Sequence, residues 1–503
     1  MRKTIVLALL TGIGATPAAA ETLREALIKA YRSNPTITAG RAQLRAADEN
    51  VPIARAGGLP SINATGTYSE NVLQANNSFL NPARFGTATT ALSIPLYQGG
   101  AVRNGVRAAE TRVEGGRAQL RGTEANLFTN VVGAYMNVIR DEAIAALNTQ
   151  NVRVLETNLT ASRDRFQVGD VTRTDVAQSE ARLALARAQL QSAQAQLISS
   201  RENYINFVGD VPGVLEQPPA LPNLPASAEV AVQRAIDGNP QIQAARRERE
   251  AARFDVGVAR AARRPRVAAV GQGQYQNFLG SIPSTIVGTT VANSATNGTL
   301  GLSLNLPIFQ GGRPAAQVRQ AQALESQAIE NATAAERVVI AQARSAFAVF
   351  RSSREVIASA EAAVAANRLS LEGVRAENSV GTRTILDILN AEQELLNSQV
   401  TLVTARRDSY VAGFALLAAM GDAEARDLNL DGGTLYDPVI NYDRVRNRIV
   451  DWGSDPTPTA VATTTAGTPA QDAAVTRPLD PALRSDVDRT PALTTGTETP
   501  SRR

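Results

Sequence analysis

The sequence lacks both cysteine and histidine over its 503 residues. Without cysteine no disulfide framework can form, and lipid attachment at a cysteine after a signal is excluded. Without thiolates or imidazoles, the common ligands of zinc are missing, and acid–base catalysis would have to rely on carboxylates, lysine or tyrosine. We therefore expect no metal site and no cofactor, and an enzyme is the least favoured class.

Aromatic residues are also scarce, at 4%, although hydrophobic residues make up 44% of the chain. An alanine-rich composition with few large rings suits long, thin helical packing better than one thick core. The 51 Lys and Arg residues nearly balance the 47 Asp and Glu residues. So balanced a charge does not indicate a nucleic-acid partner.

The first twenty residues have the three parts of a secretory signal peptide. Arg2 and Lys3 precede an apolar run over 5–13, and Ala18–Ala20 end the segment. The alternative, an uncleaved anchor helix, is disfavoured because the apolar run is too short to span a bilayer. We therefore exclude residues 1–20 from the fold.

One block of sequence occurs twice. Val168–Glu180 reads V-G-D-V-T-R-T-D-V-A-Q-S-E, and Val380–Glu392 reads V-G-T-R-T-I-L-D-I-L-N-A-E. A shift of 212 residues aligns the Val-Gly pairs and places Thr172 on Thr384. A glycine that ends one helix, followed by a Thr or Asp that caps the next, is typical of a turn between helices. Each block is predicted to be the tip of a long helical hairpin.

The rest of the chain repeats as well. Asn34-Pro35 and Asn239-Pro240 each open a predicted helix, and a shift of 205 residues relates them. The first of these helices is expected to run to about Arg55. The predicted organisation is a signal peptide (1–20), two structural repeats (21–225 and 226–428), a segment that packs on the helices (429–452) and a Thr-, Pro- and Ala-rich disordered tail (453–503).

Two very long helices lead to the predicted tips. Residues 101–167 and 313–379 have a helical pattern with hardly a proline. Apolar residues recur every seven positions, which indicates helices wound about each other: Val106, Val113, Leu120 and Leu127; Val176, Leu183, Leu190 and Leu197; Ile388, Leu395 and Leu402. Some 67 residues would form a rod of roughly 100 Å, at ~1.5 Å per residue. Such a rod is a spacer.

Strand patterns precede both long helices. Thr299–Phe309 alternates strictly, with Leu300, Leu302, Leu304, Leu306 and Ile308 on one parity. Leu92, Ile94 and Leu96 repeat this pattern in the first half. Weaker partner strands are predicted at 60–71 and 265–277.

Four strands are too few to close a membrane barrel, which needs at least eight. They could form a small sheet lying on the helices of a structural periplasmic coiled-coil protein. Alternatively, several chains could share one barrel, with the Leu row facing outer membrane lipid. Tyr97 and Phe309, at equivalent strand ends, would then suit an interfacial aromatic girdle.

The doubled tip, the paired strands and the motifs P-L-Y-Q-G-G and P-I-F-Q-G-G together resemble the TolC-type outer membrane efflux protein family over about residues 21–450. This resemblance implies a mainly α fold with a β-barrel contribution, built as a homotrimer in the outer membrane of a Gram-negative bacterium. Four strands per chain would form a shared twelve-stranded barrel, and the helical hairpins would form a periplasmic tunnel. A periplasmic adaptor (membrane fusion) protein with an inner-membrane pump or ABC transporter would open it, for efflux or type I protein secretion.

The resemblance also implies roles for residues at the tips. Asp387 matches an acidic pore constriction, whereas the next family position, one turn on, is Asn390 rather than acidic. Arg383, with Thr174 and Asp175, matches polar links that hold the tip closed. The pairs Val168-Gly169 and Val380-Gly381 match adaptor-docking grooves. The residues alone leave plainer alternatives open: a helix cap for Asp387, a surface charge for Arg383 and helix ends for the glycines.

Overall fold

The computed structural model describes residues 20–73, 82–282, 285–286, 289–290, 292–430 and 435–484. The expected signal peptide lies outside the described residues, apart from Ala20. The last nineteen residues of the expected disordered tail, 485–503, lie outside them as well.

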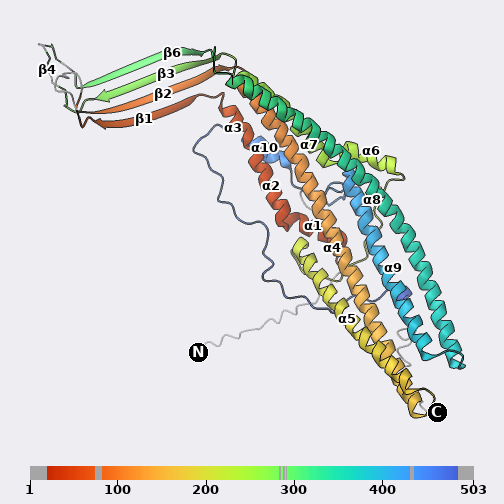
Figure 1. Ribbon diagram of the computed structural model, residues 1–503. Coiled ribbons are helices and arrows are strands. Elements are labelled where there is room, and N and C mark those ends of the chain that lie inside the picture. The colour runs from red at the N-terminus through yellow and green to blue at the C-terminus, as the bar shows by residue number, and fades with distance from the viewer. Residues whose placement is uncertain are drawn as a thin grey trace, which may run out of the picture.

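Two helical hairpins of matching size dominate the chain (Figure 1). The first joins α4 (Ala101–Gln167) to α5 (Arg173–Val208), and the second joins α8 (Arg313–Ser379) to α9 (Ile385–Met420). The long arms have 67 residues each and the short arms 36 each. The long arms thus begin and end where the sequence predicts.

Both tips are built by the predicted cap residues. Gly169 and Gly381 have φ angles of 83° and 82°, the left-handed region that stops a helix and favours glycine. Thr172 and Thr384 then start α5 and α9, each in a capping box with the aspartate three residues on. Local chemistry alone therefore accounts for the two reversals of the chain.

Shorter helices pack along the upper part of the hairpins. They are α1 (Leu23–Ser33), α2 (Pro35–Asp48), α3 (Asn50–Ala56), α6 (Ala228–Gly238), α7 (Pro240–Ala261) and α10 (Pro438–Val445). The 3-10 turn η1 (Pro481–Leu483) lies lower, against the second hairpin. The prediction of one helix from Pro35 to about Arg55 is wrong, because the helix breaks at Glu49. Pro52 explains the break: it has no N–H to donate to Asp48 and its ring crowds that carbonyl.

The helices form a curved layer. In the lower half α4 packs against α5 on one side and α9 on the other, and α8 packs against α9. In the upper half α4 lies between α2 and α7, and α7 packs on α8. Most of the heptad positions are buried, among them Val113, Leu120, Leu127, Leu183, Leu197, Ile388, Leu395 and Leu402. The layer has two open edges, with α8 on one side and α5 below α2 on the other.

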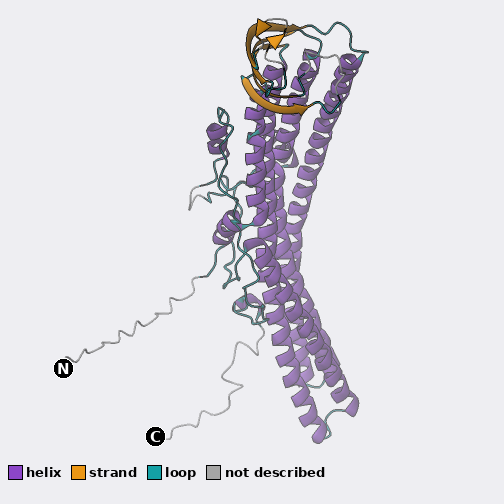
Figure 2. Cartoon of the chain, turned by 90° about the vertical axis from the view of Figure 1, so that its left-hand side faces the viewer, coloured by secondary structure: helices purple, strands orange, loops and turns teal. Residues whose placement is uncertain are grey.

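A four-stranded antiparallel sheet projects from one end of the helices (Figures 1 and 2). Its order is β1 (Ser61–Glu70), β2 (Arg84–Gln98), β3 (Arg266–Asn277) and β6 (Ser294–Asn305), with the small pair β4 (Thr285–Ile286) and β5 (Thr289–Thr290) beyond. The two repeats therefore meet where β2 pairs with β3. The last strand ends at Asn305, before the predicted Phe309, because Pro307 cannot donate to a ladder.

The C-terminal segment is more ordered than expected. Instead of being disordered from 453 onward, residues 472–484 cross the helices as a strap. Arg201 on α5, Glu142 on α4 and Gln399 on α9 bond to it in turn, and Leu483 is buried against the second hairpin. The composition of the segment does not predict this order, because the residues that bind the strap lie on α4, α5 and α9.

Within the described residues, no helix is both long and apolar enough to span a membrane.

Candidate functional site

The sheet has one apolar and one polar face. Ile62, Leu92, Gly271 and Leu300 stand opposite one another in a single row across all four strands. Side chains at paired positions share a face, and a Cβ at Gly271 would meet Leu300 and Leu92. Leu300 is 90% exposed. The next row on the other face is Asn63, Ala91, Gln272 and Thr299.

A β-bulge brings Tyr97 onto the apolar face. Simple alternation would place Tyr97 and Ile94 on different faces of the sheet. The register shifts between Pro95 and Tyr97, however, so that Tyr97 pairs with Val267. Val267 in turn pairs with Leu304. Phe309, the predicted counterpart, is exposed but lies beyond the end of β6.

A second tyrosine marks the far end of the same face. Tyr275 lies on β3 eight residues from Val267, about 27 Å along the strand at ~3.4 Å per residue. Tyr68 on β1 lies near the same end and is exposed. Tyrosines thus bracket an apolar band close to the ~25 Å of membrane barrels. The sequence prediction missed this outer pair because they sit in a weak strand pattern.

The sheet does not lie on the helices. Figure 1 shows it extending away from them, and its Leu row is uncovered. The alternative of a small sheet covering the helices of a periplasmic coiled-coil protein is therefore wrong.

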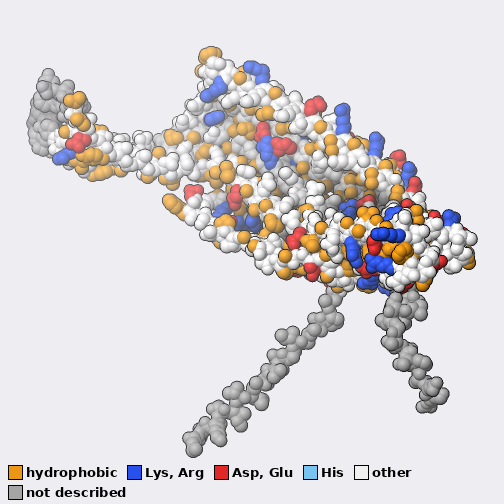
Figure 3. Space-filling view, turned by 60° about the horizontal axis from the view of Figure 1, so that its bottom comes forward, with side chains coloured by type: hydrophobic (Ala, Val, Ile, Leu, Met, Phe, Trp, Pro, Cys, Tyr) orange, Lys and Arg blue, Asp and Glu red, His pale blue; other side chains and the backbone are white. Residues whose placement is uncertain are grey.

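At the other end of the molecule, Asp387 completes the capping box of α9, whose N-cap residue is Thr384. Its carboxylate accepts hydrogen bonds from Thr384 N at 3.0 Å and Thr384 Oγ1 at 2.8 Å. These bonds lower the pKa of Asp387, led by the bond from the Thr384 backbone, so the group is ionised at neutral pH. The cap and a charge at the tip are therefore properties of the same residue. Figure 3, turned toward this end, shows acidic and basic side chains gathered there.

Asn390, one turn after Asp387, connects the two hairpins. Its Oδ1 accepts a hydrogen bond from Arg182 Nη2 on α5 at 2.7 Å. An aspartate at 390 would form an ion pair at this place, so the amide keeps the link and removes one negative charge. Its partner Arg182 lies 208 residues away along the chain, so no local sequence pattern indicates this pair.

Arg383 bonds within its own hairpin. Its Nε donates to Glu377 Oε2 at 2.7 Å, and its carbonyl accepts from Asn378 Nδ2 at 2.8 Å. Asp175 caps α5 by accepting from Thr172 N at 2.8 Å. Thr174 beside it is exposed. Within one chain the structure does not join Arg383 to Thr174 or Asp175.

The turn residues before the caps present apolar side chains to solvent. Val168 is 81% and Val380 is 73% exposed. Gly169 and Gly381 have open space around the position of a Cβ, so it is their φ angle, not crowding, that requires glycine. Each tip therefore offers an uncovered valine next to a left-handed glycine.

Glu392 is a tip residue whose role the sequence did not reveal. It is buried, and both of its oxygens accept from Asn158 Nδ2 at 3.0 Å. Arg375 Nη2 donates to the same carboxylate at 3.1 Å. Glu392 thereby joins α9 to α4 and α8. Its repeat counterpart Glu180 is exposed and pairs with Arg163.

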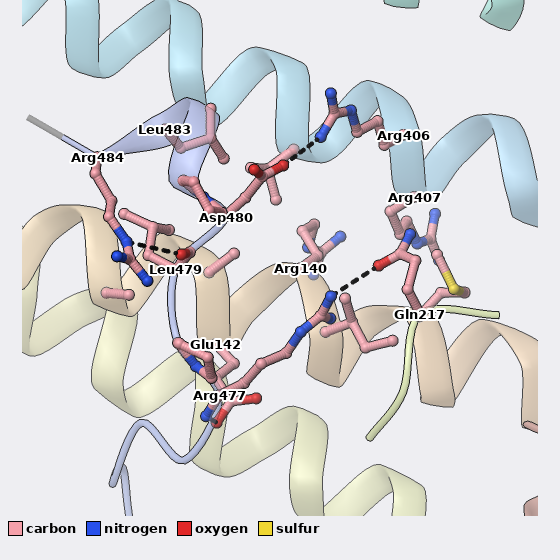
Figure 4. A pocket seen from close by; sticks show the side chains of 17 residues that line it. Arg140, Glu142, Gln217, Arg406, Arg407, Arg477, Leu479, Asp480, Leu483 and Arg484 are labelled. Carbon is pink, nitrogen blue, oxygen red and sulfur yellow. Dashed lines mark hydrogen bonds and ion pairs between the residues drawn. The ribbon is translucent and has the colours of Figure 1, made fainter. Parts of the chain in front are cut away.

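Halfway along the helices, the C-terminal strap roofs a cavity of about 580 Å³ (Figure 4). Arginines from α4, α9 and the strap line it, together with Leu479 and Leu483 of the strap. Arg477 donates to Gln217 at 3.2 Å and Arg406 to Asp480 at 3.1 Å, so both arginines hold the strap to the rest of the chain. The cavity therefore lies at the boundary where the strap packs on the hairpins.

Known proteins share this arrangement. A family model described as outer membrane efflux protein matches residues 26–209 and 231–422. The outer membrane efflux protein BepC of Brucella suis is 35% identical, over 88% of this chain and 94% of its own length. The outer membrane protein TolC of Escherichia coli is 27% identical, over 84% of this chain and 86% of its own.

Among solved structures, the outer membrane protein VceC of Vibrio cholerae superposes with a TM-score of 0.68 at 23% identity, covering 79% of this chain and 96% of that one. This match confirms the fold, and the family is one of channels rather than enzymes. The predicted location in the outer membrane is confirmed by the same family. The chain belongs to the outer membrane efflux protein family.

Proposed function

We propose that three copies of this chain form a continuous exit duct, closed at the helix tips and opened by a periplasmic adaptor coupled to an inner-membrane pump or ABC transporter. The duct would carry effluxed small molecules or proteins secreted by the type I route, and the energy would come from the partner. The single observation that carries this proposal is that the sheet and the helical layer of one chain are both left open at their edges.

The sheet edges require partners in lipid. β1 and β6 are the outer strands, and each has one row of backbone groups with no neighbouring strand among the described residues. In a bilayer such groups must be paired, because no water is available to them. Pairing β6 of one copy with β1 of the next would close a twelve-stranded barrel from three copies.

The helical layer supports the same closure. α8 carries exposed apolar side chains along its length: Leu324, Ile329, Val338, Val349, Val356 and Leu369. Large apolar side chains on an edge helix indicate a protein partner. In a closed ring the neighbour of α8 would be the α2 and α5 edge of the next copy.

The gate would lie at the tips. Three Asp387 carboxylates around one axis would attract cations and slow anions. Arg383 of one copy would reach Thr174 and Asp175 of the next, in exchange for its bond to Glu377. Exposed links of this kind contribute only ~0–1 kcal/mol each, which suits a gate that a partner must open. Val168-Gly169 and Val380-Gly381 would be the docking points for the adaptor.

Extraction from membranes followed by gel electrophoresis with and without heating tests the assembly. We expect a band of three chains that heating converts to one. Single-channel recording then tests the gate: Arg383→Ser combined with Asp175→Ala should raise conductance. A protein found only in the soluble periplasmic fraction would refute the duct. Wild-type conductance in the double variant would place the closing links elsewhere.

A further inference from the structure

The chain contains one tryptophan, and the structure leaves it in solvent. Trp452 is 98% exposed. It belongs to a C-terminal turn, defined here as residues 446–455, that also exposes Ile449 (70%) and Val450 (64%). Three large apolar side chains within four residues are an uncommon use of surface, and they indicate a contact with something outside the chain.

Two contacts show which way this turn is directed. Near the start of α10, Asn441 Nδ2 donates to Asp48 Oδ2 at the end of α2 at 2.7 Å. Just after α10, the carbonyl of Arg446 accepts from Arg55 Nη1 at 2.8 Å, at the end of α3. The chain therefore runs alongside α2 and α3 toward the sheet, beside α3 in Figure 1.

The turn begins close to the base of the sheet. Arg55 precedes the start of β1 at Ser61 by six residues, which corresponds to roughly 10–20 Å. The Tyr97 end of the apolar face lies at this base. The turn thus comes near the level where the sheet would leave the membrane on the periplasmic side.

Ion pairs join the two ends of the C-terminal turn. Arg444 makes a bidentate pair with Asp455, at 2.8 Å for both nitrogen–oxygen distances. Arg448 adds a second contact to Asp455 at 3.5 Å. The chain must reverse between these residues, so Ile449, Val450 and Trp452 lie on a loop held at both ends.

We infer that the C-terminal turn inserts into the headgroup region of the periplasmic leaflet of the outer membrane, with phospholipid as its partner. Tryptophan is enriched at this depth because its ring is amphipathic. The turn lies near the Tyr97 end of the apolar sheet face, and this inference rests on that face meeting lipid. Between Arg444 and Asp455 the charges are three arginines and two aspartates. Insertion should therefore depend on apolar contact and not on anionic lipid.

The single tryptophan makes the test direct. The full-length protein is reconstituted in nanodiscs of zwitterionic phospholipid, with the lipid either plain or brominated near the top of its acyl chains. We expect brominated lipid to remove most of the Trp452 emission, and acrylamide to quench it less in nanodiscs than in detergent. Both effects should persist at high salt. Emission that acrylamide quenches fully and brominated lipid leaves unchanged would overturn the inference.

Two relocated reporters calibrate this result. In a Trp452→Phe background, Leu302→Trp places the probe on the apolar face of β6. Val461→Trp places it at an exposed position between the C-terminal turn and the strap. Strong lipid quenching is expected for the first and none for the second. If Leu302→Trp is quenched but Trp452 is not, the turn does not insert while the barrel stands. If neither is quenched, the sheet itself does not meet lipid.

A further variant separates lipid from protein as the partner. Ile449→Ser with Val450→Ser should reduce lipid quenching of Trp452 several-fold without changing that of the β6 reporter. Protection of Trp452 from acrylamide with no effect of brominated lipid would mean that the turn is covered by a neighbouring copy, which would also overturn the inference.

Discussion

At the scale of single residues, substitution can separate the capping role of Asp387 from the pore charge proposed for it. Asp387→Asn keeps a side-chain oxygen for the Thr384 cap but removes the charge. In single-channel recording we expect the concentration of a trivalent cation needed for half block to rise by on the order of tenfold, since three carboxylates are lost from one ring.

An exposed carboxylate near the other tip provides the control. Glu180→Gln removes a charge that pairs with Arg163 and should leave the cation block unchanged. Equal loss of block in both variants would mean that general tip charge, and not a ring at position 387, attracts the cation.

Glu392 allows a similar comparison within the repeat. Glu392→Ala leaves Asn158 and Arg375 without their buried acceptor and should lower the free energy of unfolding by about 2–3 kcal/mol. Glu180→Ala removes an exposed pair with Arg163 and should cost about 0–1 kcal/mol. Thermal unfolding followed by circular dichroism measures both, and equal losses would contradict the structural role of Glu392.

At the scale of elements, the junction between α4 and the end of α9 should be sensitive to pH. Burial raises the pKa of Glu124 to about 7 from 4.5, although Ala425 N donates to it. Between these values the folded chain holds a proton that the unfolded chain releases. This contribution to stability is complete below about pH 4.5 and is lost as the pH rises through 7, by at most about 3 kcal/mol.

Melting curves between about pH 5 and pH 8 check this slope. Glu124→Gln should flatten it, because the amide does not titrate. Glu229→Gln on α6 should not, because hydrogen bonding lowers the pKa of Glu229 and keeps its titration below this window. An unchanged slope in Glu124→Gln would place the pH dependence elsewhere.

The C-terminal strap is expected to depend on one carboxylate. Glu142 Oε1 accepts from Thr476 N at 2.6 Å, Thr476 Oγ1 at 2.7 Å and Arg477 N at 3.1 Å. Glu142→Ala leaves these donors unpaired and loosens the strap, so trypsin should cleave after Arg484, the strap arginine that no proline follows, about tenfold faster or more. Glu202→Ala, which removes one exposed bond to Gln471, should have a smaller effect. Mass spectrometry of timed digests distinguishes the two.

At the scale of the whole molecule, closure between copies can be tested by disulfides, because the natural chain has no cysteine. β1 and β6 lie at opposite edges of the sheet, about 14 Å apart at three strand spacings. A disulfide within one chain is therefore excluded. Asn63→Cys on β1 is combined with a second cysteine whose position is moved along β6. Covalent dimers and trimers should form only when the second cysteine pairs with position 63 of the neighbouring copy. Monomer at every register would contradict the shared barrel.

Sequence alone determined the local architecture. The long helices, their capped tips and the alternating strands follow from neighbours within a few residues, through glycine and threonine caps, heptads and parity. The helix break near Pro52 is also a local effect and could have been predicted. The comparison with the second repeat, where α7 is unbroken, pointed instead to one continuous helix.

Only the tertiary structure decided which residues meet across the fold. The pairs Arg182–Asn390 and Glu392–Asn158, the bulge that turns Tyr97 to the apolar face, and the strap held by Glu142 all join segments far apart in the chain or depend on a strand's partner. Such contacts leave no periodic signal, because their energy depends on distance and burial, and these are set by how the two repeats pack.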